Sequence, residues 1–186
     1  SSKSSKSSEL NDKKIVFIHI PRTGGTSIKS ALNLHDKIYK EDVYHMSAND
    51  IPKGCEDYFK FAIVRNPFDR FVSLYFYNKS ESYKEKFPDK LTTKVAEEYD
   101  FKEWLDNFPY KHIQQVDFGV EKLDYVGRYE NLDYELDVVF NTKIKKENFT
   151  NHNHYSYYYD EESIEKVREL SLKDIEVYSY SYEEYK

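Results

Sequence analysis

Cysteine and long apolar runs are nearly absent from this sequence, and each absence excludes a class of protein. The single cysteine, Cys55, excludes an internal disulfide and a cysteine-built metal cluster. A transmembrane helix needs about 20 consecutive apolar residues, and no apolar run in this sequence approaches that length. There is also no signal-peptide pattern. A complete chain of this kind is expected in the cytoplasm. Because the chain begins without methionine, the possibility that a segment or a membrane anchor was removed stays open. The sequence does not predict the oligomeric state.

Positive charge is also in short supply, and arginine most of all. The 28 Lys and Arg residues face 34 Asp and Glu, and the net charge of −6 argues against non-specific nucleic-acid binding. Any anion site must therefore be local. Only five residues are arginine, and three of them, Arg22, Arg65 and Arg70, follow two short apolar runs. The planar guanidinium suits bidentate binding of an oxyanion, although Arg70 equally suits pairing with nearby acids.

The first of these turns has the pattern of an anion-binding loop. Residues 15–20 are β-branched, aromatic and apolar, which predicts a buried strand, and Pro21 ends it. Gly24 and Gly25 permit positive φ and close backbone approach. A helical apolar pattern follows, and a helix N-terminus directs free N–H groups and a positive dipole end at one point. We predict a phosphate or sulfate site here, with an ordinary strand-to-helix turn as the alternative. Its polar candidates are Arg22, Thr26 and Ser27.

The second turn follows a second apolar run. Residues 59–64 predict a buried strand, and Arg65 comes directly after it, where open α/β sheets bind their ligands. Asn66 and Pro67 then begin a helix as N-cap and first-turn residues. Ser73 lies two turns into that helix, where its hydroxyl can reach the same ligand as Arg65 or remain a solvated helix serine.

A nucleotide-hydrolysing P-loop is disfavoured but stays open. Its pattern, GxxxxGK[ST], places a lysine before the hydroxyl residue, whereas Gly25 precedes Thr26 here. Such enzymes also commonly end a second strand in an acidic metal ligand, whereas this strand is followed by Arg65. A positive charge at the position where a metal-binding carboxylate is expected favours a second anion site and argues against a metal there.

The rest of the chain predicts one α/β domain. Residues 1–12 are a polar low-complexity tail, and residues 13–186 form the domain, with a mainly parallel sheet of about four or five strands. The lysine- and glutamate-rich stretch 78–94 is expected to be a solvated insertion. Further strands are expected within 37–44 and 124–129, and further helices within 101–108, within 132–140 and after Asp160.

Two motifs carry a resemblance to a known family. HIPRTGGTSI resembles the 5′-phosphosulfate loop, and FAIVRNPFDRFVSLY the 3′-phosphate segment, of sulfotransferases that use 3′-phosphoadenosine-5′-phosphosulfate. The motifs resemble those of the group of carbohydrate (heparan- and chondroitin-type) enzymes and their small bacterial and viral relatives. Weaker similarity extends the match from about Lys14 to Tyr180.

The resemblance implies a P-loop-like three-layer fold, a carbohydrate hydroxyl as acceptor, 3′,5′-adenosine bisphosphate as product and no metal. It implies that His45 is the general base and that Arg22 stabilises the transferring group. The 3′-phosphate would meet Arg65 and Ser73, and Tyr155 belongs to the adenine-side loop. The residues of the implied phosphosulfate loop are Pro21, Arg22, Thr23, Gly24, Gly25, Thr26 and Ser27.

One residue departs from the family pattern. The family loop usually carries lysine where this chain has Arg22, which keeps the charge but changes the shape of the cation. A binding module that retains the donor pocket without turnover therefore stays a second alternative. The residues of an acceptor cleft do not follow from spacing alone.

Overall fold

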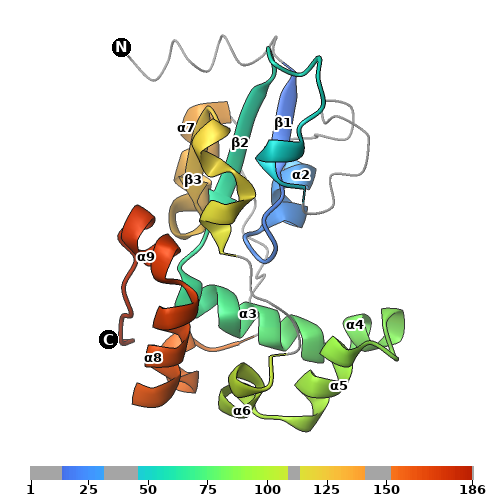
Figure 1. The fold of residues 1–186 in the computed structure, drawn as a ribbon, viewed down its shortest axis with the longest axis vertical. Coiled ribbons are helices and arrows are strands. Elements are labelled where there is room, and N and C mark those ends of the chain that lie inside the picture. The colour runs from blue at the N-terminus through green and yellow to red at the C-terminus, as the bar shows by residue number, and fades with distance from the viewer. Residues whose placement is uncertain (1–13, 32–45, 109–113, 141–151, 186) are drawn as a thin grey trace. The chain divides into compact units, whose positions relative to one another are not determined.

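The computed structural model describes residues 14–31, 46–108, 114–140 and 152–185 (Figure 1). The predicted tail 1–12 and the strand predicted within 37–44 lie outside these ranges. The chain divides into two compact units, each built from two stretches. The first unit combines Ser1–Arg65 with Gln115–Phe149, and the second combines Asn66–Gln114 with Thr150–Lys186. The single domain predicted for residues 13–186 stays a prediction.

A parallel sheet forms the centre of the first unit. Its strands are β1 (Ile15–Ile18), β2 (Phe59–Val64) and β3 (Tyr125–Arg128), in the order β1-β2-β3. Ile18 pairs with Ala62, and Val64 pairs with Arg128, so the carboxyl ends of all three strands lie at one edge. The parallel α/β class is confirmed, and β2 has its predicted bounds. The described residues hold three strands rather than the four or five expected.

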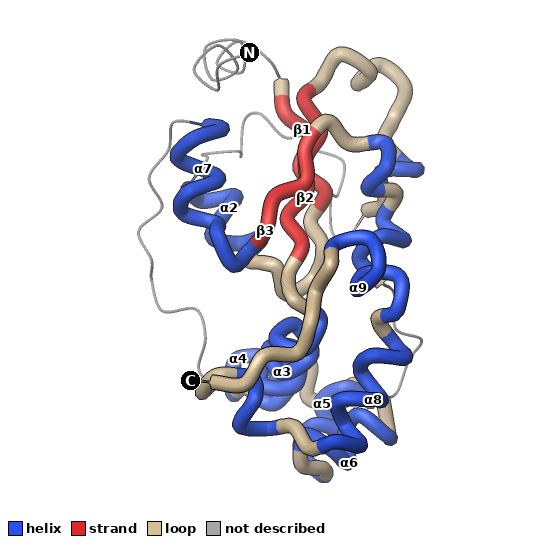
Figure 2. The backbone as a smooth tube through the Cα atoms, turned by 90° about the vertical axis from the view of Figure 1, so that its left-hand side faces the viewer, coloured by secondary structure: helices blue, strands red, loops and turns tan. Residues whose placement is uncertain are grey.

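Helices α2 (Gly25–Ala31) and α7 (Leu132–Phe140) lie on the same side of this sheet (Figure 2). Alternate strand residues, including Phe17 and Phe61, pack with Ile28 of α2 and Leu136 of α7 in one apolar cluster. The intervening strand residues are buried as well, as expected for a parallel sheet covered on both faces. The unit's short 3-10 helices are η2 (Ala48–Asp50), η3 (Gln115–Phe118), η4 (Val120–Lys122) and η5 (Tyr129–Asn131).

The described part of the second unit is helical. Its longest helix, α3 (Pro67–Lys79), begins at Asn66, whose side chain accepts a hydrogen bond from the Phe68 N–H at 3.0 Å. This confirms the predicted N-cap. The unit's other helical elements are α4 (Glu81–Lys86), α5 (Leu91–Glu98), α6 (Phe101–Asp106), η6 (Tyr155–Tyr158), α8 (Glu161–Leu170) and α9 (Leu172–Tyr178).

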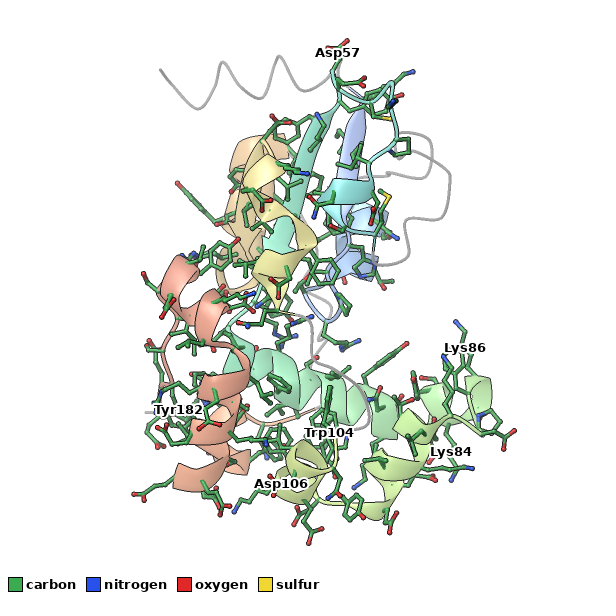
Figure 3. All side chains as sticks on the ribbon, viewed as in Figure 1. Asp57, Lys84, Lys86, Trp104, Asp106 and Tyr182 are labelled. Carbon is green, nitrogen blue, oxygen red and sulfur yellow. The ribbon has the colours of Figure 1, made fainter. Side chains whose placement is uncertain are left out.

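Aromatic side chains dominate the core of the second unit. Trp104 of α6 is fully buried (Figure 3), and its ring packs edge-on against Phe71 of α3. Tyr159 donates a hydrogen bond to the Phe68 carbonyl at 2.6 Å. Tyr182, near the end of the chain, packs edge-on against Phe68. The frequent tyrosines of the C-terminal section thus contribute to packing.

The polar stretch 78–94 differs from the expected solvated insertion. It contains α4 and the start of α5, and Ser80 caps α4 by accepting a hydrogen bond from the Tyr83 N–H. Tyr83 is 9% exposed and Thr93 is fully buried, and the Thr93 hydroxyl donates to the Phe87 carbonyl at 2.7 Å. A few buried side chains at helical spacing therefore outweigh the high charge content.

Candidate anion-binding site

The predicted phosphosulfate loop, residues 21–27, follows the carboxyl end of β1. Thr23 is fully buried, and its hydroxyl donates to the Ile20 carbonyl at 2.8 Å, which closes the turn. Arg22 and Gly24 both have positive φ, at 63° and 84°. Only glycine adopts this region without cost, so Arg22 holds a strained backbone. Pro21 precedes it and is partly buried.

The loop runs directly into helix α2. The first helical hydrogen bond joins the Ile28 N–H to the Gly24 carbonyl at 3.0 Å. The N–H groups of Gly25, Thr26 and Ser27 precede that bond and have no acceptor within the helix. The Thr26 side chain is exposed and that of Ser27 is partly exposed. This arrangement has the donors that an oxyanion needs.

Gly25 cannot carry a side chain in this structure. A Cβ at this position would overlap the imidazole ring of His19. The His19 ring in turn stacks on Phe17, with ring centroids 5.8 Å apart. His19, which follows β1, therefore supports the loop by packing against Gly25.

Arg65 is fixed at the carboxyl end of β2 by its backbone. It is only 2% exposed. Its N–H donates to the Gln115 Oε1 at 2.8 Å, and the Gln115 side-chain nitrogen donates to the Arg65 carbonyl at 2.7 Å. Gln115 is itself fully buried. One amide side chain thus satisfies both backbone polar groups of Arg65 and limits its movement.

The guanidinium of Arg65 reaches the loop. Its Nη1 donates to the Arg22 carbonyl at 3.1 Å, and its Cζ lies 4.0 Å from the ring centroid of Tyr129. A desolvated cation over an aromatic face is worth about 2 kcal/mol, which offsets part of the cost of burying the charge. The structure therefore brings Arg22, Gly24 and Arg65 together at one edge of the sheet, as the strand-end argument requires.

The half-buried carboxylate of Glu135 supports the end of β3. The Arg128 N–H donates a hydrogen bond to Glu135 of α7, and a Cβ at Gly127 would overlap the same carboxylate oxygen. Burial raises the pKa of Glu135, and the hydrogen bonds from Arg128 and Tyr125 only partly oppose that rise. Burial beside Glu135 also raises the pKa of Tyr125 to about 12. This cluster fixes the turn that follows β3.

Three predicted site residues do not belong to the described part of the first unit. His45 is outside the described residues. Ser73 is 3% exposed within α3 of the second unit. Tyr155, in η6 of the same unit, is 6% exposed, and its hydroxyl accepts a hydrogen bond from the Glu183 N–H at 2.9 Å. The contacts predicted for these residues with the donor stay predictions.

Two residues of the site are not among the sequence-based candidates. Tyr129 follows β3 as Arg65 follows β2, so the strand-end rule that selected Arg65 selects Tyr129 as well. Gln115 has no such signal, because a glutamine in a connecting segment resembles any polar linker residue. Only the paired hydrogen bonds to Arg65 show what it does.

Comparison with known proteins assigns the chain to a class. The model of the sulfotransferase family matches residues 10–181, so the chain belongs to that family. Neither the curated proteins nor the solved structures contain a match. Within the described ranges, no helix combines the length and the apolar character needed to cross a membrane.

Proposed function

We propose that this sulfotransferase moves a sulfuryl group from 3′-phosphoadenosine-5′-phosphosulfate to a hydroxyl of a carbohydrate, with 3′,5′-adenosine bisphosphate as product. The observation that carries this proposal is the hydrogen bond from the buried Arg65 guanidinium to the Arg22 carbonyl. It joins a glycine-containing loop and a fixed arginine, two groups that suit the two anionic ends of such a donor.

Within the first unit, the roles divide between the loop and the arginine. The N–H groups of the first turn of α2, with the hydroxyls of Thr26 and Ser27, hold the 5′-phosphosulfate. Arg65 holds the 3′-phosphate, and the family resemblance adds Ser73 to that role and Tyr155 to the adenine side. Gly24 and Gly25 allow this loop to form, because the Tyr129 and His19 rings lie where their side chains would be.

When bound, the donor supplies an activated sulfuryl group. Arg22 stabilises the negative charge that develops on the transferring group and the leaving phosphate, which is the kind of electrostatic contribution that is usually largest. His45 accepts the proton of the acceptor hydroxyl, a contribution of about 10²–10⁴ in rate. Fixed cations and backbone N–H groups provide the positive charge in this scheme.

Transfer of radioactive sulfur from labelled donor to a panel of polysaccharides and small phenols tests the proposal. We expect labelled polysaccharide with the wild type and a kcat lower by about 10²–10⁴ in His45→Ala. His152→Ala serves as a matched histidine control, because His152 stacks on Phe76 in the second unit. We expect it to keep wild-type turnover.

The other outcomes separate the alternatives. Donor binding without transfer to any acceptor would show a binding module, for which Arg22 in the place of lysine is the best argument. Turnover of ATP with magnesium, and none with the sulfated donor, would show a nucleotide enzyme. Unchanged turnover in His45→Ala would remove that residue from the mechanism and leave the rest of the proposal.

A further inference from the structure

Tyr129 contacts both anion-binding parts of the first unit. One face of its ring lies under the Arg65 guanidinium, with Cζ 4.0 Å from the ring centroid. Two carbons at its edge, Cδ2 and Cε2, lie 3.2 Å from the position that a Cβ on Gly24 would occupy. Gly24 belongs to the loop, and Arg65 follows β2. The Tyr129 ring therefore packs against both groups beside their direct hydrogen bond, which runs from Arg65 Nη1 to the Arg22 carbonyl.

The turn that carries Tyr129 is itself anchored. Tyr129 begins η5, and the N–H of Arg128 just before it is held by the carboxylate of Glu135. Tyr129 and the following Leu132 pack against the apolar cluster between the sheet, α2 and α7. These contacts hold the Tyr129 ring against the sheet unit, beside the Arg65 guanidinium.

We propose that Tyr129 is a positioning residue that gives the site its preference for an adenosine bisphosphate over a monophosphate. The cation–π contact with the Tyr129 ring holds the Arg65 guanidinium over the ring face. Together with the bond to the Arg22 carbonyl, this contact sets the guanidinium at one distance from the loop. A second phosphate at that distance gains a bidentate contact. The inference rests on the proposed function, because it takes the loop and Arg65 as the donor site.

Calorimetric titration of each variant with 3′,5′-adenosine bisphosphate and with adenosine 5′-phosphate tests this role. The measured quantity is the ratio of the two dissociation constants. In Tyr129→Leu we expect the preference for the bisphosphate to fall about tenfold. Tyr129→Phe keeps the aromatic face and is expected to keep the preference. Tyr134→Leu is the control, because Tyr134 is 61% exposed on α7.

Tyr129→Met is measured in parallel, because it fills much of the same volume without an aromatic face, and thermal unfolding reports whether each variant folds. A wild-type preference in folded Tyr129→Leu and Tyr129→Met would overturn the inference and leave the proposed function intact. A preference lost in Tyr129→Phe would also overturn it, since the hydroxyl would then be responsible. A wild type that does not bind the bisphosphate would overturn the proposed function, and the inference with it.

Discussion

At the scale of single residues, the loop depends on positions where a side chain is excluded. Gly24 combines a φ of 84° with a close approach to the Tyr129 ring, and Gly25 has the His19 ring where its Cβ would be. Gly127 leaves the space that the Glu135 carboxylate fills. Each glycine therefore has its own physical reason, and the reason for Gly24 involves a residue distant in the sequence, Tyr129.

Gly25→Ala tests the contact beneath the loop. We expect the free energy of unfolding, measured by urea denaturation, to fall by about 1–3 kcal/mol, because the new methyl group forces the His19 ring to move. Ser30→Ala, at an exposed position of the same helix, is expected to have little effect. Adding His19→Ala to Gly25→Ala removes the overlap, so the double variant is expected to recover part of the loss. Wild-type stability in Gly25→Ala would contradict the described packing.

Some of the site follows from residue types and their order. Arg65 and the glycine loop are predictable because each comes directly after an apolar strand, and the structure places them together. The paired hydrogen bonds between Gln115 and the Arg65 backbone were not predictable. The two residues are 50 positions apart, and the sequence around neither one indicates a contact with the other. The positive φ of Arg22 was equally hidden, because side-chain type does not favour it there.

At the scale of elements, capping residues explain where helices begin. Asp160 caps α8, with its carboxylate accepting a hydrogen bond from the Ser163 N–H at 2.9 Å, and the Ser163 hydroxyl is in turn within reach of the Asp160 N–H at 2.8 Å. The sequence predicted this helix from the same aspartate. It did not predict that the helix ends at Leu170 and that α9 follows, because Ser171 offers no strong stop signal.

The Asp160 cap gives a prediction for pH. Hydrogen bonds from the backbone and side chain of Ser163, followed by Lys102, lower the pKa of Asp160 from 3.8 to about 2. Because the folded-state pKa is the lower one, the carboxylate's stabilisation is complete above about pH 4 and is lost as the pH falls towards 2. Asp160→Asn keeps a capping oxygen but does not titrate.

Urea denaturation of the wild type and Asp160→Asn over this range measures the effect. The stability advantage of the wild type is expected to shrink as the pH falls from about 4 to about 2. Asp160→Ala is expected to lose about 1 kcal/mol at neutral pH, because it leaves the Ser163 N–H without its acceptor. A constant difference between wild type and Asp160→Asn across the window would contradict the assigned contacts.

Elements with strong apolar periodicity were predictable, and those with weak periodicity were not. β2 and α3 match because their buried residues are continuous or regularly spaced. Helices α4 and α5 were missed because their surfaces are highly charged. An ion pair between Lys84 and Glu97 joins the two helices at their exposed surface. In the sequence, such charged residues are as typical of a solvated loop as of a helix.

At the scale of the whole molecule, the sequence and the family comparison support the same class. The parallel sheet carries the loop and Arg65 at the ends of adjacent strands, and the family match extends over residues 10–181. The division into two units was not predictable, because each unit combines stretches that are distant in the sequence. Local patterns do not show which distant stretches pack together.

Calorimetric titration of the full chain with 3′,5′-adenosine bisphosphate tests the central claim most directly. Wild type is expected to bind, and Arg65→Ala is expected to bind at least about 30-fold more weakly, because the ligand's phosphate loses a buried cation. Arg168→Ala is the matched control, since Arg168 pairs with Glu165 on the surface of α8, and it is expected to bind as the wild type does. No measurable binding to the wild type, or undiminished binding to Arg65→Ala, would contradict the assignment of this site to the sulfuryl donor.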